Sequence, residues 1–243
     1  MKINWGLIKF LIISCLIVFV FGFSKQRNEV RRIDKIDIEF KDENRLFITQ
    51  NTVNKLLIQY KDTVTSIGKE TLDLNKMESR LLENPMIKDA EVYVTIDGVL
   101  GAKVVQRNPV ARVDDNPNFY LDEDGLKMPL STVHSARVPI ITGIEENQYA
   151  EVIELVKKIA NDEFMNEYVV GLDVSDEGNV ILRIRKNEFK VLFGKSIDIE
   201  NKFQKFKAFY KLTKQDSLLE NYSLINLRFN NQVVATKRRT NGE

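Results

Sequence analysis

A continuous apolar stretch near the N-terminus, Trp5 to Phe23, constrains this chain more than any other feature. Lys9 is its only charged residue. At roughly 1.5 Å per residue, a helix over the stretch reaches about 28 Å, close to the hydrocarbon thickness of a bilayer. Lys9 lies about one turn from Trp5, so its ammonium can reach the interface where the indole sits. The stretch predicts a single transmembrane helix over residues 5–23.

The same residues leave other interpretations open. Gly22 and Ser24 supply a weak signal-peptide cleavage site. The run that ends at Cys15 loosely resembles a lipoprotein acylation site, although too much apolar sequence follows that cysteine. Basic residues flank both ends of the stretch, so the positive-inside rule leaves the orientation open. Because residues 1–4 are too few for a domain, we expect all folded material on the C-terminal side.

Composition sets broad limits on the remaining chain. Its length suits one to two domains. Lys and Arg number 36 and Asp and Glu 35, for a formal charge of +1, so bulk electrostatics favour neither nucleic acid nor an acidic partner. Cys15 is the only cysteine, which excludes an internal disulfide.

After a charged juxtamembrane linker, residues 24–32, the first folded region begins. Apolar and acidic residues alternate over 33–40, and this period of two predicts a strand. Thr49 is suited to cap a following helix, whose apolar stripe runs from Val53 to Tyr60.

A second, shorter helix is expected from Asn75, because Asn75 and Glu78 fit a capping box. Beyond it, Asp97-Gly98 separates two extended runs, which is a strong hairpin signal. Residues 33–106 are therefore predicted to form a compact α+β module in the order strand, helix, helix, strand, strand.

Residues 107–237 predict a second, mixed or antiparallel β domain with flanking helices, followed by a tail at 238–243. The alternation predicts strands at 119–121, 138–144, 169–174, 180–184, 189–193 and in two segments within 224–237. Helical spacing predicts helices at 146–164 and 198–214. The final strand is expected near an edge of the sheet.

Residue types that carry chemistry are present without the partners they need. His134 is the only histidine and has no cysteine nearby, which argues against a metal site or a catalytic triad. Gly194-Lys195-Ser196 resembles the end of a phosphate-binding loop, but Lys190 stands where the upstream glycine is required. A plain strand-to-helix turn is the better interpretation.

The acidic run Asp122-Glu123-Asp124 lacks the periodic ligands of a calcium loop, so an exposed turn is expected. The aromatic residues from Phe203 to Tyr210 follow helical spacing, which predicts core packing rather than a ligand face. The basic run 237–239 is expected to be a solvated end. We therefore expect no catalytic, cofactor or metal site, and binding becomes the default class of function.

Several short motifs are loose singly but specific in their order. They are Leu72-Asp73-Leu74, Met77-Glu78, Leu81, Asn84-Pro85, Ala90-Glu91-Val92, Gly98, residues 106–112, residues 119–125, Val138-Pro139, Thr142-Gly143, Phe193-Gly194-Lys195 and Asn226-Leu227-Arg228-Phe229. With these motifs in this order, the chain resembles the FtsQ/DivIB family of bacterial cell-division proteins.

The resemblance implies a POTRA domain at 33–106 and a β domain at 107–237. It also implies a single-pass inner-membrane protein with a cytoplasmic N-terminus, so that both domains lie in the periplasm or its equivalent at the division septum. Members of this family are non-enzymatic scaffolds that bind the coiled-coil proteins FtsL and FtsB/DivIC and help regulate septal peptidoglycan synthesis. The tail at 1–4 is short for this family.

In the family, an FtsB-type partner adds a strand to the last strand of the β domain. The resemblance places that site here at Asn226, Leu227, Arg228, Phe229, Gln232, Val233, Val234 and Ala235. The physical interpretation agrees, because an edge strand offers unpaired N–H and C=O groups and its alternate side chains select the partner. Phe229 stands where the family often has tyrosine; packing of Phe229 in the core is the alternative.

Two other functions remain open from the residues alone. A POTRA-bearing component of outer-membrane transport or secretion requires several POTRA units or a downstream barrel, and neither is visible in the sequence. A membrane-anchored envelope enzyme requires a nucleophile, paired carboxylates or metal ligands in one setting.

Overall fold

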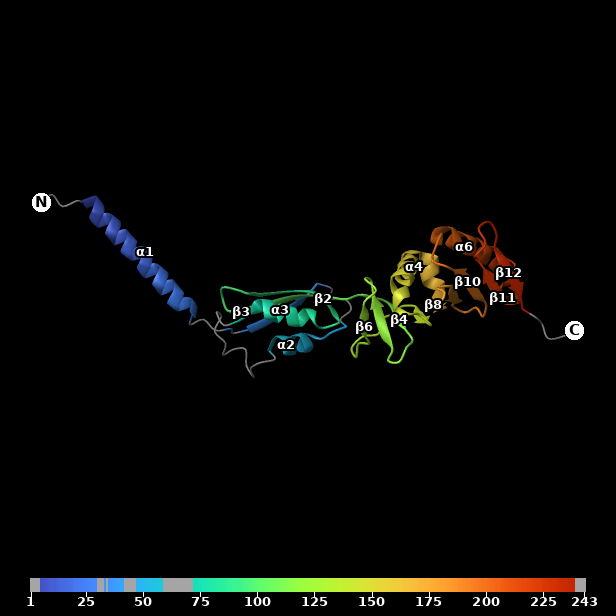
Figure 1. Cartoon of the computed structure of the whole chain (residues 1–243), viewed down its shortest axis with the longest axis horizontal. Coiled ribbons are helices and arrows are strands. Elements are labelled where there is room, and N and C mark those ends of the chain that lie inside the picture. Colours follow the sequence, from blue (N-terminus) through green and yellow to red (C-terminus); the bar gives the residue numbers. More distant parts are fainter. Residues whose placement is uncertain (1–4, 30–32, 34, 42–46, 59–71, 239–243) are drawn as a thin grey trace. The chain divides into compact units, whose positions relative to one another are not determined.

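The structure is a computed structural model that describes residues 5–29, 33, 35–41, 47–58 and 72–238. The predicted tail at 1–4, the stripe residue Tyr60 and residues 239–243 lie outside this range. The chain divides into two compact units, residues 1–106 and 107–243. Figure 1 shows the elements of each unit in sequence colours.

The N-terminal apolar stretch forms α1 (Trp5–Glu29), whose large apolar side chains are exposed. The helix continues into the region predicted as a linker, 24–32. No helix among the described parts of the chain combines the length and the apolar character needed to cross a membrane. The prediction of a transmembrane helix over 5–23 is therefore corrected.

The first unit has the predicted order of strand, helix, helix, strand, strand. Its elements are β1 (Lys35–Phe40), α2 (Gln50–Ile58), α3 (Leu74–Leu82), β2 (Ile87–Val94) and β3 (Val99–Gln106). The sheet order is β1-β3-β2, with β1 parallel and β2 antiparallel to the central β3. Gly98 adopts the positive φ of 88° that the β2–β3 turn requires.

The caps of the two helices in this unit were predicted with mixed success. Thr49 precedes α2, and its hydroxyl accepts a hydrogen bond from the Thr52 N–H at 3.1 Å. In α3 the cap is Asp73 instead of the predicted Asn75, because Asp73 is extended and its carboxylate accepts the Lys76 N–H at 3.0 Å. The helix therefore begins one residue before Asn75.

The second unit contains a nine-stranded mixed sheet in the order β12-β11-β10-β9-β8-β7-β4-β5-β6. Its strands are β4 (Pro109–Val113), β5 (Phe119–Asp122), β6 (Lys127–Pro129), β7 (Ile140–Thr142), β8 (Val169–Val174), β9 (Val180–Ile184), β10 (Lys190–Gly194), β11 (Tyr222–Asn226) and β12 (Val234–Lys237). The predicted meander is β8, β9 and β10 in antiparallel pairing. Neither β4 nor β6 was predicted.

The long helix predicted at 146–164 is three elements. They are the 3-10 turn η3 (Glu146–Gln148), α4 (Tyr149–Asn161) and α5 (Glu163–Tyr168). The break lies at Asp162, whose extended backbone and side chain cap α5 through the Met165 N–H at 3.0 Å. The predicted helix at 198–214 is α6 (Ile199–Gln215), and the 3-10 turn η4 (Leu219–Asn221) precedes β11.

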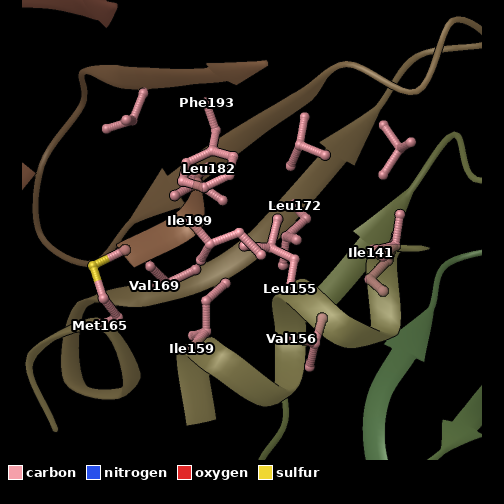
Figure 2. Close-up of a cluster of buried hydrophobic side chains, with 14 of the residues drawn as sticks. Ile141, Leu155, Val156, Ile159, Met165, Val169, Leu172, Leu182, Phe193 and Ile199 are labelled. Atoms are coloured by element: carbon pink, nitrogen blue, oxygen red, sulfur yellow. The ribbon is translucent and has the colours of Figure 1, made fainter. Parts of the chain in front are cut away.

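The core of the second unit lies between its helices and one face of the sheet. Strand residues such as Leu172, Leu182 and Phe193 are fully buried together with Leu155 and Ile159 of α4. Figure 2 shows these side chains converging from the strands and α4. The aromatic residues of α6 belong to this core, as predicted: Phe203, Phe206 and Tyr210 are buried and Phe209 packs against the cluster.

Candidate partner-binding edge

The last strand, β12, lies at one end of the nine-stranded sheet. It pairs antiparallel with β11, with Val234 opposite Asn226 and Ala235 opposite Ile225. No other strand in the described residues pairs with its outer side. A strand in this position has one row of backbone N–H and C=O groups directed away from the sheet.

Side chains along β12 alternate between the two faces of the sheet. Val233 and Ala235 are half-buried and pack against the core. Val234, 39% exposed, and Thr236, also exposed, alternate with them and lie on the face that the core does not cover. Both faces of an added strand would therefore meet apolar surface at this edge.

The residues that end β11 are structural in character. Asn226 is half-buried, and its side-chain oxygen accepts the Arg228 N–H at 3.1 Å. Leu227 is completely buried, and its N–H donates to the Leu192 carbonyl at 2.9 Å. Because a buried side chain cannot touch a partner, Leu227 contributes to the edge only through the packing beneath it.

The loop between β11 and β12 exposes the rest of the predicted site. Arg228, Phe229 and Gln232 are all exposed, and Phe229 retains 45% of its accessible surface. Phe229 is therefore a surface residue, and the alternative that it packs in the core is wrong. The aliphatic part of Arg228 lies over Gly194, where an added Cβ would come within 2.8 Å of its Cγ.

The opposite end of the sheet is less suited to strand addition. That edge is β6, which is only three residues long and includes Pro129. Proline lacks the N–H that a ladder needs, and natural proteins use short strands and prolines to protect sheet edges. Of the two edges of the nine-stranded sheet, β12 is therefore the one whose strand keeps all of its backbone donors.

Helix α6 contributes an unpredicted contact to the β11–β12 loop. The Lys205 ammonium donates to the carbonyl oxygens of Phe229 at 2.7 Å, Asn230 at 3.3 Å and Leu227 at 3.4 Å. The position of Lys205 among the aromatic residues of α6 gave no indication of this contact, because the sequence does not show which loop packs against the helix.

One turn earlier, Lys202 is buried beside β10. Its ammonium donates to the Lys195 carbonyl at 2.7 Å and lies 4.6 Å from the centroid of the Phe193 ring. Burial lowers the pKa of Lys202, and the positive charge of Lys205 lowers it further. Neighbouring lysines of α6 thus hold the ends of β10 and β11.

Comparison with known families identifies this fold. Residues 108–236, over half of the chain, match the family model described as FtsQ/DivIB, C-terminal related. The chain belongs to the FtsQ/DivIB family. Residues 32–105 match the POTRA-like domain model. The resemblance inferred from the ordered motifs is confirmed, and the match over the β domain decides against the alternative of a POTRA-bearing transport component.

Individual proteins that are similar in sequence to this FtsQ/DivIB-family protein agree with the family assignment. The cell division protein FtsQ of Geotalea daltonii is 26% identical over 184 residues, covering 70% of this chain and 66% of that protein. FtsQ of Koribacter versatilis is 25% identical over 174 residues, covering 66% of this chain and 50% of that protein. The chain thus spans between half and about two thirds of the length of these relatives.

A solved structure is also similar, the major extracytoplasmic domain of the trans isomer of the cell-division protein DivIB from Geobacillus stearothermophilus. The two sequences are 14% identical, and the match covers 45% of this chain and 96% of the solved domain. Its TM-score of 0.33 is too low to support an argument about the fold.

Features weighed for chemistry in this FtsQ/DivIB-family protein have structural roles. Gly194-Lys195-Ser196 is the turn from β10 to α6, as predicted, with Gly194 at φ 75°. Asp122, expected in an exposed turn, is instead 2% exposed. Among the described residues, no group of three or more His, Cys, Asp or Glu is placed to hold a metal ion. Members of this family are in general non-catalytic division proteins.

Proposed function

We propose that this protein is a non-enzymatic scaffold of the bacterial division machinery whose β domain binds FtsL- and FtsB/DivIC-type partners. The partner of FtsB/DivIC type adds a strand to β12, and the assembly helps control septal peptidoglycan synthesis. Family membership supports the division role. The observation that carries the binding proposal is the unpaired outer side of β12 at the end of the nine-stranded sheet.

The composition of the edge favours an apolar, extended partner segment. Backbone hydrogen bonds to β12 supply affinity that does not depend on sequence, and alternate side chains supply selection. Val234 lies on the open face and Val233 and Ala235 lie toward the core. Phe229 beside them offers an exposed ring for an apolar contact. A partner strand with small or branched apolar residues at alternate positions suits this surface.

We assign one role to each of the two folded regions of the chain. Residues 33–106 act as the POTRA domain and residues 107–237 as the β domain, both on the extracytoplasmic side of the cytoplasmic membrane at the septum. Attachment to that membrane is assigned to α1, since a run of exposed apolar side chains such as Phe10, Ile12 and Phe19 requires an apolar environment. A chain that lacks residues 5–29 is expected to be absent from the membrane fraction of lysed cells, whereas the full chain is found there.

Proline substitutions test strand addition directly. Successive N–H groups of a strand point to opposite sides. Of the two substitutions Ala235→Pro and Thr236→Pro, one therefore removes an edge donor and the other removes a donor of the β11–β12 ladder. The variant that loses the edge donor is recognised by an unchanged circular dichroism spectrum and a melting temperature within about 3 °C of the original. We expect it to lose at least about tenfold in affinity for the purified FtsL- and FtsB/DivIC-type pair.

The matched control is Pro129→Ala at the opposite edge, which adds a donor to β6 and is expected to leave partner affinity unchanged. Equal capture by the original chain and by the folded edge-proline variant would overturn the site. Reproducible hydrolysis of peptidoglycan by the purified protein would overturn the scaffold role.

A further inference from the structure

The loop that connects β11 to β12 is held by a side chain from another element. Lys205 is half-buried in the second turn of α6, and its ammonium contacts the carbonyl oxygens of Leu227, Phe229 and Asn230. These three acceptors belong to one short loop and converge on one nitrogen.

The chemistry of this contact is specific for an ammonium group. A lysine ammonium has three N–H donors and no acceptor, which matches three converging carbonyl oxygens. Without the cation, these converging oxygens would direct three partial negative charges at one another. The ammonium therefore selects a loop conformation that is otherwise unfavourable, and hydrogen bonds to a charged donor are stronger than neutral ones.

The part of α6 that carries Lys205 is packed into the core of the second unit. Phe203 and Phe206, on either side of Lys205 in the sequence, are buried in the core. The neighbouring Lys202 ties α6 to the end of β10 through the Lys195 carbonyl. Since β10 and β11 are adjacent parallel strands, the helix holds both of the strands that lead to the edge.

We infer that Lys205 is a positioning residue for partner binding: it fixes the β11–β12 loop and thereby holds β12 in register at the sheet edge. β12 has four residues and a partner strand on one side only, so few other contacts of its own set its direction. The inference rests on the proposed function, because it concerns how the same edge is kept ready to accept a strand. Lys205 itself does not need to touch the partner.

The test compares two lysines of the same helix in the full-length chain in detergent micelles. Lys205→Met removes the ammonium and keeps an unbranched side chain as far as Cε. Lys207→Met is the matched control, because Lys207 contacts the Asp162 carboxylate on the other side of the helix. Two quantities are measured, the amide hydrogen exchange of residues 234–237 and the affinity for the FtsL- and FtsB/DivIC-type pair.

For Lys205→Met we expect exchange in β12 to be faster by about tenfold or more and partner affinity to fall by about tenfold, while exchange in β8 and β9 is unchanged. For Lys207→Met we expect β12 exchange and affinity within about twofold of the original. Lys205→Cys treated with 2-bromoethylamine restores an ammonium at nearly the original length and should restore both quantities. The original chain treated in the same way controls for alkylation of Cys15, the only native cysteine.

The outcomes separate this inference from the function on which it rests. If Lys205→Met binds as tightly as the original chain while the folded edge-proline variant does not, the positioning role is wrong and strand addition stands. If neither variant loses affinity, strand addition itself is wrong. A loss of affinity in Lys207→Met equal to that in Lys205→Met would show a general effect on α6 and would also overturn the positioning role.

Discussion

Arg107 donates a hydrogen bond from Nη1 to the Oδ2 of Asp122 at 2.7 Å, and both side chains are largely shielded from solvent. The other carboxylate oxygen of Asp122 accepts the N–H groups of Asp124 at 2.9 Å and Leu126 at 2.8 Å. One buried carboxylate therefore fixes both the β5–β6 turn and the first residue of the second unit.

Removal of this carboxylate should be costly. Asp122→Ala leaves the Arg107 charge and two backbone N–H groups without their acceptor, and we expect a loss of about 3–5 kcal/mol in the free energy of unfolding. Asp122→Asn keeps an acceptor for the turn and should lose less. Urea denaturation followed by circular dichroism measures both. The exposed neighbour Glu123→Ala is the control, with an expected change within about 0.5 kcal/mol; an equally large loss there would contradict the role of Asp122.

A second prediction concerns the open face of the sheet, where the Arg183 guanidinium lies over Gly171. Nη2 of Arg183 donates to the Ile140 carbonyl at 2.8 Å. Its Nε lies 3.2 Å from the Asp173 Oδ1, an ion pair without hydrogen-bond geometry. A Cβ on Gly171 would come within 2.4 Å of the guanidinium.

Gly171→Ala should therefore displace Arg183 and cost about 1–2 kcal/mol of stability. In an Arg183→Ala background the obstacle is gone, and the same Gly171→Ala change should be close to neutral. The double-mutant cycle measures this coupling. Equal costs of Gly171→Ala in both backgrounds would show that the guanidinium is not the reason for the glycine.

The stability of the α4–α5 junction should depend on pH. Partial burial alone would raise the pKa of Asp162, but hydrogen bonds from Lys207 and the Met165 N–H hold that pKa below its usual value. A lowered folded-state pKa contributes stability above the unfolded-state value of about 3.9, and this contribution is lost as pH falls through the folded-state pKa.

Asp162→Asn keeps the helix cap and removes the charge. We expect this variant to be about 1–2 kcal/mol less stable at pH 7, with the difference from the original chain shrinking as the pH is lowered below about 4. Urea denaturation at a series of pH values measures the difference. A constant difference from pH 7 to pH 3 would exclude the charge of Asp162 as its cause.

Local patterns predicted those parts of the fold that local interactions determine. The hairpin at Asp97-Gly98, the meander β8 to β10 and the helix with its buried Phe203 and Phe206 were all visible as periodicity or turn chemistry. Pairing between strands that lie far apart in the sequence could not be predicted in this way. The parallel pairs β1–β3, β4–β7, β7–β8 and β10–β11 depend on contacts that no local period encodes. The proline that begins β4 concealed that strand, since proline usually marks a break.

The candidate site was predicted in outline. The edge position of β12 followed from the final extended segment and the family resemblance. The sequence did not predict which residues of the site face the core and which face solvent, because Leu227 and Phe229 stand in the same short run. Their opposite environments depend on the packing of the β11–β12 loop under α6, as does the role of Lys205.

This contrast gives a paired prediction. Leu227→Ala opens a cavity in the core and should lower stability by about 2–5 kcal/mol. Phe229→Ala removes an exposed ring and should leave stability within about 0.5 kcal/mol but weaken partner binding by several-fold. Phe229→Tyr should bind as the original does. Denaturation and affinity are measured on the same preparations, and a large stability loss for Phe229→Ala would contradict its surface position.

Strand addition at β12 is tested most directly by site-specific photo-cross-linking in dividing cells. A photoreactive residue at Val234, on the exposed face of β12, is compared with one at Lys211, an exposed position on α6. We predict a cross-linked product with the FtsB/DivIC-type partner from position 234 and none from position 211. A partner product from position 211 with none from position 234 would contradict binding at this edge.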